Sequence, residues 1–189
     1  MKDELFLRGE KVPMTKEAVR ALALAKLELH RASHLIDIGA GTGSVSIEAA
    51  LQYPSLQVTA VERNPAALQL LDENRQHFAC GNIEILPGEA PMVITERADA
   101  IFMGGSGGHL TDLIDWSMRQ LHPAGRLVMT FILQENLNTA LAHLDHLGVQ
   151  GVDCLQLQVS SLTSLGNGHY FKPNNPVFVI ACQKEGNHV

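Results

Sequence analysis

The sequence predicts an α/β fold, in which one domain spanning residues 1–189 contains a doubly wound and mostly parallel sheet. Apolar segments of strand length alternate with segments of helical periodicity along most of the chain, which is typical of parallel βαβ units. A glycine-rich turn links the first apolar strand to a helix, as in many sheets of this type. The last two predicted strands have no helix between them, so we expect them to pair antiparallel.

The first helix and the first strand are expected near the N-terminus. Thr15 is a favourable N-cap and Glu17 suits the positive end of the helix dipole, so a helix is predicted from Thr15. Apolar residues at helical spacing extend this helix to Leu27. The segment 34–38, HLIDI, is short and mostly apolar, and it predicts a buried strand.

A helix, a strand and another helix follow the glycine turn. Residues 44–51 continue as a helix, and residues 58–62 form the next strand. Asn64 before Pro65 is a strong helix start, because asparagine caps free N–H groups and proline suits the first helical position. This helix is expected to reach Phe78.

The C-terminal half continues the alternation and ends on two strands. Strands are expected at 83–86, 98–103 and 126–133, and helices at 110–121 and 136–147, the last of which ends at Gly148. The final strands, near 152–160 and 177–182, are joined by a polar segment rich in glycine, asparagine and proline. We expect them to form a C-terminal antiparallel hairpin at the end of the sheet.

The composition narrows the class of protein. A hydrophobic content of 46% and a charged content of 18% are typical of a globular chain. The net charge of −6 gives no support to a nucleic-acid partner, and no apolar stretch is long enough to cross a membrane. Cys80, Cys154 and Cys182 are dispersed and odd in number, which favours reduced thiols in a cytoplasmic protein and argues against a cysteine-based zinc site.

The segment 37–43, DIGAGTG, is the strongest motif. Glycines are needed where the backbone turns sharply and where a ligand lies against it. The dinucleotide pattern G-x-G-x-x-G fails here, because Ser44 stands where its third glycine should be. The spacing [D/E]-x-G-x-G-x-G instead resembles the first motif of S-adenosylmethionine methyltransferases. A turn that serves only chain reversal is the alternative.

Three further features follow later strands. Glu62 ends the second strand, where a carboxylate can accept hydrogen bonds from both hydroxyls of a ribose. The tetrapeptide at 88–91, GEAP, follows the third strand in register with the other motifs, at the place where the backbone of methyltransferases meets the adenine. A plain turn is the alternative for this tetrapeptide. The glycine-rich loop 104–108 follows the fourth strand and precedes His109, a candidate catalytic base whose alternative is an ordinary residue at a helix start.

The remaining candidates are weaker. His143 and His146 have a spacing that can ligate metal, but they lie among leucines and fit the polar side of an amphipathic helix. We therefore expect no metal site. The motif Asn-Pro-Pro-aromatic, which is typical of amino-group methylation, is absent.

With these motifs, the chain resembles the decarboxylating precorrin methyltransferases of cobalamin biosynthesis over nearly its whole length. The specific match combines the N-terminal segments 6–9 (FLRG) and 12–16 (VPMTK) with the tetrapeptide 88–91 and the loop 104–108. The resemblance implies a Rossmann-like, seven-stranded, mostly parallel sheet with a C-terminal antiparallel hairpin. It also implies methylation of carbon 15 of a corrin-type tetrapyrrole, with decarboxylation of the acetate on carbon 12.

The resemblance further implies the residues of the site. Cofactor contacts carried over by position, with two glycines of the fourth-strand loop added, are Thr15, Gly39, Ala40, Gly41, Thr42, Gly43, Glu62, Ala90, Gly104 and Gly105. A polycarboxylate substrate needs cations and close backbone approach, for which the candidates are Arg8, Lys11, Lys16, Arg20, Gly107 and Gly108. An ordinary solvated basic stretch is the alternative for these cations.

The expected cofactor is S-adenosyl-L-methionine. The lack of a fused second methyltransferase resembles the anaerobic branch of the pathway, which implies cobalt-precorrin-6B as substrate, and the resemblance implies a homotetramer. Two other interpretations stand beside this one. The chain could methylate another small molecule or RNA, although an aromatic content of 5% does not favour RNA. It could also be a cofactor-binding subunit without activity.

Overall fold

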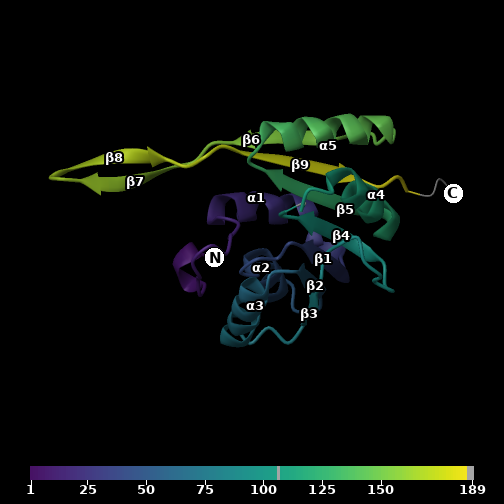
Figure 1. Cartoon of the computed structure of the whole chain (residues 1–189), viewed down its shortest axis with the longest axis horizontal. Coiled ribbons are helices and arrows are strands. Elements are labelled where there is room, and N and C mark those ends of the chain that lie inside the picture. Colours follow the sequence, from purple (N-terminus) through teal and green to yellow (C-terminus); the bar gives the residue numbers. More distant parts are fainter. Residues whose placement is uncertain (106, 187–189) are drawn as a thin grey trace.

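The main element of the fold is a seven-stranded sheet, seen in a computed structural model that describes residues 1–105 and 107–186 (Figure 1). Its strands are β1 (His34–Ile38), β2 (Gln57–Glu62), β3 (Ile83–Pro87), β4 (Ala98–Met103), β5 (Leu121–Phe131), β6 (Asp153–Leu157) and β9 (Val177–Gln183). The helices are α1 (Glu17–Leu27), α2 (Ser44–Gln52), α3 (Pro65–His77), α4 (Leu110–Gln120) and α5 (Gln134–His146), with 3₁₀ turns at Asp3–Leu5 and Leu29–Arg31. A separate ribbon consists of β7 (Ser160–Leu165) and β8 (Gly168–Pro173).

The strand order is β3-β2-β1-β4-β5-β9-β6. The strands from β1 to β5 pair in parallel, whereas β9 runs antiparallel to β5 on one side and to β6 on the other. This confirms the predicted α/β fold, its mostly parallel sheet and the antiparallel pairing of the C-terminal strands. Because the chain order reverses between β1 and β4, the carboxyl ends of these strands border a crevice of the kind that binds ligands in open α/β sheets.

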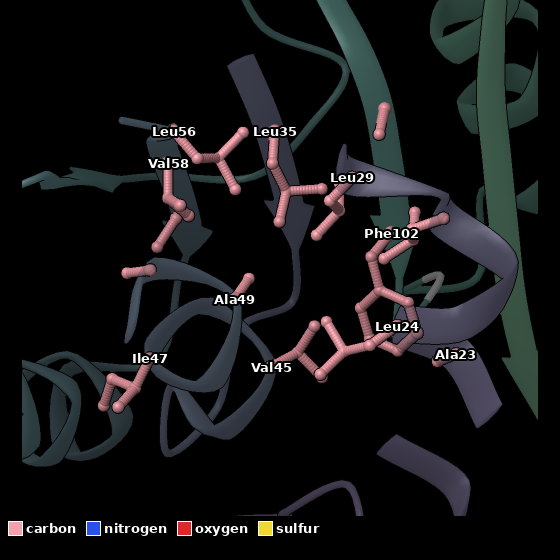
Figure 2. Close-up of a cluster of buried hydrophobic side chains, with 14 of the residues drawn as sticks. Ala23, Leu24, Leu29, Leu35, Val45, Ile47, Ala49, Leu56, Val58 and Phe102 are labelled. Carbon is pink, nitrogen blue, oxygen red and sulfur yellow. The ribbon is translucent and has the colours of Figure 1, made fainter. Parts of the chain in front are cut away.

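Helices cover both faces of the sheet, so its central strands are buried on both sides. On β1, Leu35 packs among side chains of α1 and α2, whereas its neighbour Ile36 packs with side chains of α4. Figure 2 shows Leu24 of α1, Val45 of α2 and Phe102 of β4 gathered on the first face. A strand that alternates between two apolar layers is expected to be mostly apolar, as Leu35, Ile36 and Ile38 of β1 are.

Two helix ends follow the local rules that predicted them. The Asn64 side chain accepts hydrogen bonds from the backbone N–H groups of Ala66 and Ala67, and Pro65 occupies the first position of α3. Gly148 follows α5 with a φ of +71°, the left-handed conformation that glycine adopts without strain. No helix among the described residues is long and apolar enough to cross a membrane.

Three expected boundaries were wrong. Thr15 does not cap α1: the helix begins at Glu17 after Lys16, and the Glu17 N–H donates instead to the Asp3 carboxylate at 2.9 Å. β5 begins at Leu121 rather than at residue 126, because a register shift opposite β4 accommodates Pro123. The strand predicted at 152–160 ends at Leu157, and the polar segment after it contains the ribbon β7–β8.

Candidate functional site

The glycine turn at 39–43 leaves β1 at the carboxyl edge and is bonded to β2. The N–H groups of Gly39 and Ala40 both donate to the Val61 carbonyl, at 2.9 and 3.1 Å. Gly41 has a φ of +57°, and a Cβ atom there would lie 2.5 Å from the Pro13 carbonyl oxygen. A side chain at Gly41 would therefore have to displace the backbone of the N-terminal segment.

That N-terminal segment crosses the turn and is held by α3. The buried amide of Asn74 accepts from the Leu7 N–H at 2.7 Å and donates to the carbonyls of Leu7 and Thr42, both at 3.0 Å. One side chain thus ties residue 7 and the glycine turn together. This role of Asn74 could not be predicted from the sequence, since an asparagine inside a helix has no local pattern that points to distant carbonyls.

Glu62 lies at the end of β2 and faces the turn. One carboxylate oxygen accepts from the Gly41 N–H at 2.9 Å, and the other accepts from the N–H groups of Arg63 and Asn64 at 2.9 and 2.8 Å. The side chain is buried but borders a cavity. A carboxylate has about four acceptor positions, so three backbone donors leave capacity for a ligand hydroxyl.

A first cavity, of about 180 Å³, opens between Glu62, the turn and the loops after β3 and β4. Ala90 and the backbone at Gly88 form its far wall. Arg63 and Glu89 also border it and form an ion pair at 2.6 Å, with both side chains about half exposed. The cavity is narrow and polar on the Glu62 side, which suits a sugar and an attached ring better than a long chain.

A second cavity, of about 330 Å³, meets the first at Pro13, Gly39, Gly104 and Gly105. A Cβ atom at Gly39 would lie 3.3 Å from the Gly105 nitrogen, so the turn and the loop after β4 approach closely without side chains between them. The second cavity continues toward Thr15, Lys16 and the end of β5. The two cavities therefore adjoin across the carboxyl edge, where two ligands could lie side by side.

Asp37, behind the turn, is buried and turned toward α2. The Ser46 hydroxyl donates to one of its oxygens at 2.5 Å, while the other oxygen, like the Thr42 hydroxyl, has no hydrogen-bond partner among the described residues. Burial raises the pKa of Asp37 to about 6; the bonds from Ser46 oppose this rise, and the charge of Glu62 adds to it. The turn therefore contains acceptor capacity that no neighbouring protein group uses.

Most of the predicted cofactor residues come together. Those that border one of the two cavities are Thr15, Gly39, Ala40, Glu62, Ala90, Gly104 and Gly105, while Gly41, Thr42 and Gly43 complete the turn behind them. Lys16 borders the second cavity and Gly107 the first. Ser106, within the predicted loop 104–108, lies outside the described residues.

Other predicted residues lie apart from the cavities. Arg8, Lys11 and Gly108 are exposed and border neither of them, and His109 is exposed at the start of α4. Among the described residues, no group of three or more histidines, cysteines or acids is placed to hold a metal ion. His143 bonds instead to Asp115, at 2.8 Å.

The expected substrate role of Arg20 was wrong. Its side chain is fully buried, and the guanidinium donates to Glu48 at 2.5 Å, to Asp3 at 3.2 Å and to the Thr15 carbonyl at 2.6 Å. With these partners and no exposed surface, it cannot reach a substrate carboxylate. It fixes the backbone at Thr15, beside the second cavity.

Several residues of the site were missed from the sequence. Arg63 and Glu89 stand next to predicted residues and carry charge, so their position beside Glu62 and Ala90 was a usable signal. For Pro13, the only signal in the sequence was its position within the segment 12–16. Ile132 and Leu133, two apolar residues just beyond a strand, had no local signal for exposure.

Comparison with known proteins places these features in a wider context. A family model described as a precorrin methyltransferase domain matches residues 6–184. The chain is 84% identical over 189 residues to the cobalt-precorrin-6B C(15)-methyltransferase (decarboxylating) of Salmonella typhimurium, covering all of this chain and 98% of that protein. It is 34% identical over 187 residues to the probable enzyme of this name in Saccharolobus solfataricus, covering 96% and 94%.

Solved structures of similar proteins agree with the family match and the sequence relatives. The precorrin-6y C5,15-methyltransferase from Geobacter metallireducens superposes with a TM-score of 0.90 at 33% identity, over 97% of this chain and 96% of that one. The precorrin 8W decarboxylase from Methanobacterium thermoautotrophicum superposes with a TM-score of 0.87 at 30% identity, over 96% and 98%. Both superpositions cover nearly the whole of this chain.

Proposed function

This chain belongs to the precorrin methyltransferase family, and we propose that it transfers a methyl group from S-adenosyl-L-methionine to carbon 15 of cobalt-precorrin-6B and decarboxylates the acetate on carbon 12. The observation that carries the proposal is the 84% identity to an enzyme of that name over the whole chain. The two adjoining cavities at the carboxyl edge support it, because a methyl donor and its acceptor have to lie side by side.

The residues around the first cavity fit the proposed cofactor. Free acceptor capacity on Glu62 suits the two ribose hydroxyls, and the wall at Ala90 suits the adenine. The turn at 39–43 allows close backbone approach to the methionine part, with Thr15 on its far side. When bound, the cofactor supplies an electrophilic methyl group, so the protein needs no nucleophile of its own.

The chain's own residues would then act by positioning. Glu62 and the glycine turn would hold the cofactor in place. Gly104 and Gly105 leave the passage between the cavities open, because they carry no side chain. Lys16, which borders the second cavity, can contact a substrate carboxylate. Arg8, Lys11, Gly107 and Gly108 stay candidate substrate contacts, and His109 stays a candidate base.

We further propose that the chain is a cytoplasmic, single-domain protein that assembles as a homotetramer. Support for assembly comes from the ribbon β7–β8, which projects from the sheet and pairs with no other strand (Figure 1). A two-stranded ribbon is marginally stable by itself in water. Its cross-strand pair Leu162 and Phe171 exposes 62% and 68% of its side-chain surface, which favours contact with another copy of this chain.

Mass spectrometry tests the reaction directly. Cobalt-precorrin-6B incubated with the protein and S-adenosylmethionine should gain one methyl group and lose one carbon dioxide, a net change of about −30 mass units. A product that keeps all its carboxyl groups and gains about 14 mass units would leave a methyltransferase without the decarboxylation. No change with this substrate, together with methyl transfer to RNA or to another small molecule, would contradict the proposed substrate.

A further inference from the structure

Two apolar side chains at the second cavity are exposed although they directly follow the mostly buried end of β5. Ile132 and Leu133 follow β5 and expose 62% and 59% of their surface, while the preceding Phe131 exposes 5%. Both border the second cavity, together with Val177 at the start of β9. A single exposed leucine needs no explanation, but an adjacent pair inside a cavity of ligand size indicates an apolar occupant.

The position of the second cavity indicates which molecule lies beside its occupant. The second cavity meets the first at Gly39, Gly104 and Gly105, so a molecule against Ile132 lies next to whatever fills the cradle of Glu62 and the glycine turn. The passage has glycine on both sides. The occupant of the second cavity is thus the molecule that receives the transferred group, provided that the proposed function holds.

The lining of the same cavity also carries a positive charge. Lys16 is about half exposed there, and its ammonium group lies 4.0 Å from the Asp3 carboxylate, too far for a hydrogen bond. It can therefore turn to a ligand at small cost. A lining that combines exposed apolar side chains with a cation suits a molecule with a broad apolar face and acidic groups at its rim.

The space available is larger than a small metabolite requires. A third cavity, of about 540 Å³, adjoins the second at Lys16, Val19 and Val177 and extends along α1 toward the base of the ribbon β7–β8. The two cavities share three lining residues, so a large substrate with side chains could extend from one into the other. Lys16 borders both, where it could contact a peripheral carboxylate of such a substrate.

From these contacts we infer that Ile132 and Leu133 form the surface on which the tetrapyrrole ring of the substrate lies, with Lys16 contacting one of its peripheral carboxylates. The inference rests on the proposed function and adds specificity-determining residues to it. Both apolar residues lie between the end of β5 and the start of α5, so the sheet fixes their distance from the passage at Gly105.

The test is the double variant Ile132→Ser/Leu133→Ser, compared with Leu51→Ser. Leu51 on α2 is also partly exposed, at 43%, but borders none of the three cavities. Three quantities are measured for each protein: the KM for cobalt-precorrin-6B, the Kd for S-adenosylhomocysteine by calorimetry, and the native mass. The double variant should raise KM roughly tenfold or more, since two apolar contacts are lost, and should leave the Kd and the mass unchanged.

Every other result of these measurements would overturn a specific part of the inference. An unchanged KM in the double variant, with normal turnover in the wild type, would remove Ile132 and Leu133 from the substrate site and leave the proposed function intact. A lower native mass would assign the pair to a contact between copies of this chain. Absence of turnover in the wild type would refute the proposed function and, with it, this inference.

The variant Lys16→Gln tests the carboxylate contact. Its KM for cobalt-precorrin-6B should rise and should depend less on salt concentration than the KM of the wild type. An unchanged salt dependence would remove the contact between Lys16 and a substrate carboxylate.

Discussion

The glycine turn at 39–43 and the ribbon β7–β8 are both excursions from the sheet, but they are held in opposite ways. The turn is bonded to Val61, Glu62 and Asn74 and lies under the Pro13 carbonyl, all within the chain. Within the described part of the chain, the strands of the ribbon pair only with each other, and they expose large apolar side chains. A binding cradle can thus be held entirely by its own chain, whereas an exposed apolar ribbon needs a partner to be explained.

The strongest test of the first half of this comparison is Gly41→Val. The branched side chain would meet the Pro13 carbonyl and force a left-handed backbone on a residue that disfavours it. We expect the free energy of unfolding to fall by about 3 kcal/mol or more, with cofactor binding lost. Urea unfolding and calorimetry measure the two effects.

Gly105→Val is the matched control for Gly41→Val. A Cβ atom at Gly105 would have no neighbour within 4 Å, so the free energy of unfolding should change by only about 0.5 kcal/mol. Activity should still fall strongly, because the side chain would enter the passage between the two cavities. Equal losses of stability in the two variants would show that the turn is not held by the Pro13 contact.

A second effect concerns the charge behind the turn. Burial raises the pKa of Asp37 from 3.8 to about 6, so the folded protein holds the proton more tightly than the unfolded chain. The free energy of unfolding therefore falls as the pH rises from about 4 to about 6, by a total of about 3 kcal/mol. Asp37→Asn removes this charge and keeps an acceptor for Ser46.

Urea titrations at two pH values measure this effect. We expect Asp37→Asn to be more stable than the wild type by up to about 3 kcal/mol at neutral pH and about equally stable near pH 4. The same variant should bind S-adenosylhomocysteine more weakly if the unpaired oxygen serves the ligand. A variant that is less stable than the wild type at neutral pH would mean that Asp37 is ionised without cost.

The third effect is smaller and concerns Glu62. Glu62→Gln keeps an oxygen for one side of the turn but replaces the charge and one acceptor. We expect cofactor affinity to fall by about 1.5–3 kcal/mol, the range for hydrogen bonds to charged groups. The control Glu84→Gln changes a charge on β3, outside both cavities of the site, and should leave the affinity unchanged. Equal affinity in the two variants would rule out the ribose contact.

The sequence predicted the parts of the fold that local chemistry controls. The apolar strands, the glycine turn and the Asn64 cap all have patterns within a few residues, and each lies where it was expected. Arg20 shows the limit, because its partner Glu48 is distant in sequence and belongs to another helix. The cations near Arg20 in the sequence suggested a substrate site, but only the packed structure shows that the Arg20 side chain is buried.

The ribbon was missed for a related reason. Its segment is rich in polar and turn residues, and Leu162 and Phe171 become neighbours only when the strands are in register. The exposed pair at Ile132 and Leu133 was missed as well, because apolar residues after a strand normally predict burial. In both places the apolar side chains face something other than the chain's own core.

The smallest effect on the stability of one chain is expected at the ribbon. Leu162→Ser/Phe171→Ser should reduce the native mass below that of a tetramer, while the Kd for S-adenosylhomocysteine stays unchanged. Light scattering measures the mass, and Leu147→Ser, a partly exposed residue beyond α5, serves as the control. A tetramer that survives in the double variant would show that the ribbon is not the contact between copies.

The most direct measurement of the central claim, that residues 37–62 form a cradle for S-adenosylmethionine, is the thermal unfolding of the wild-type protein with S-adenosylhomocysteine and, separately, with NAD. At a ligand concentration one hundredfold above its Kd, S-adenosylhomocysteine should stabilise the protein by about 2.7 kcal/mol, and NAD should leave the melting temperature unchanged. Stabilisation by NAD without any by S-adenosylhomocysteine would contradict the claim.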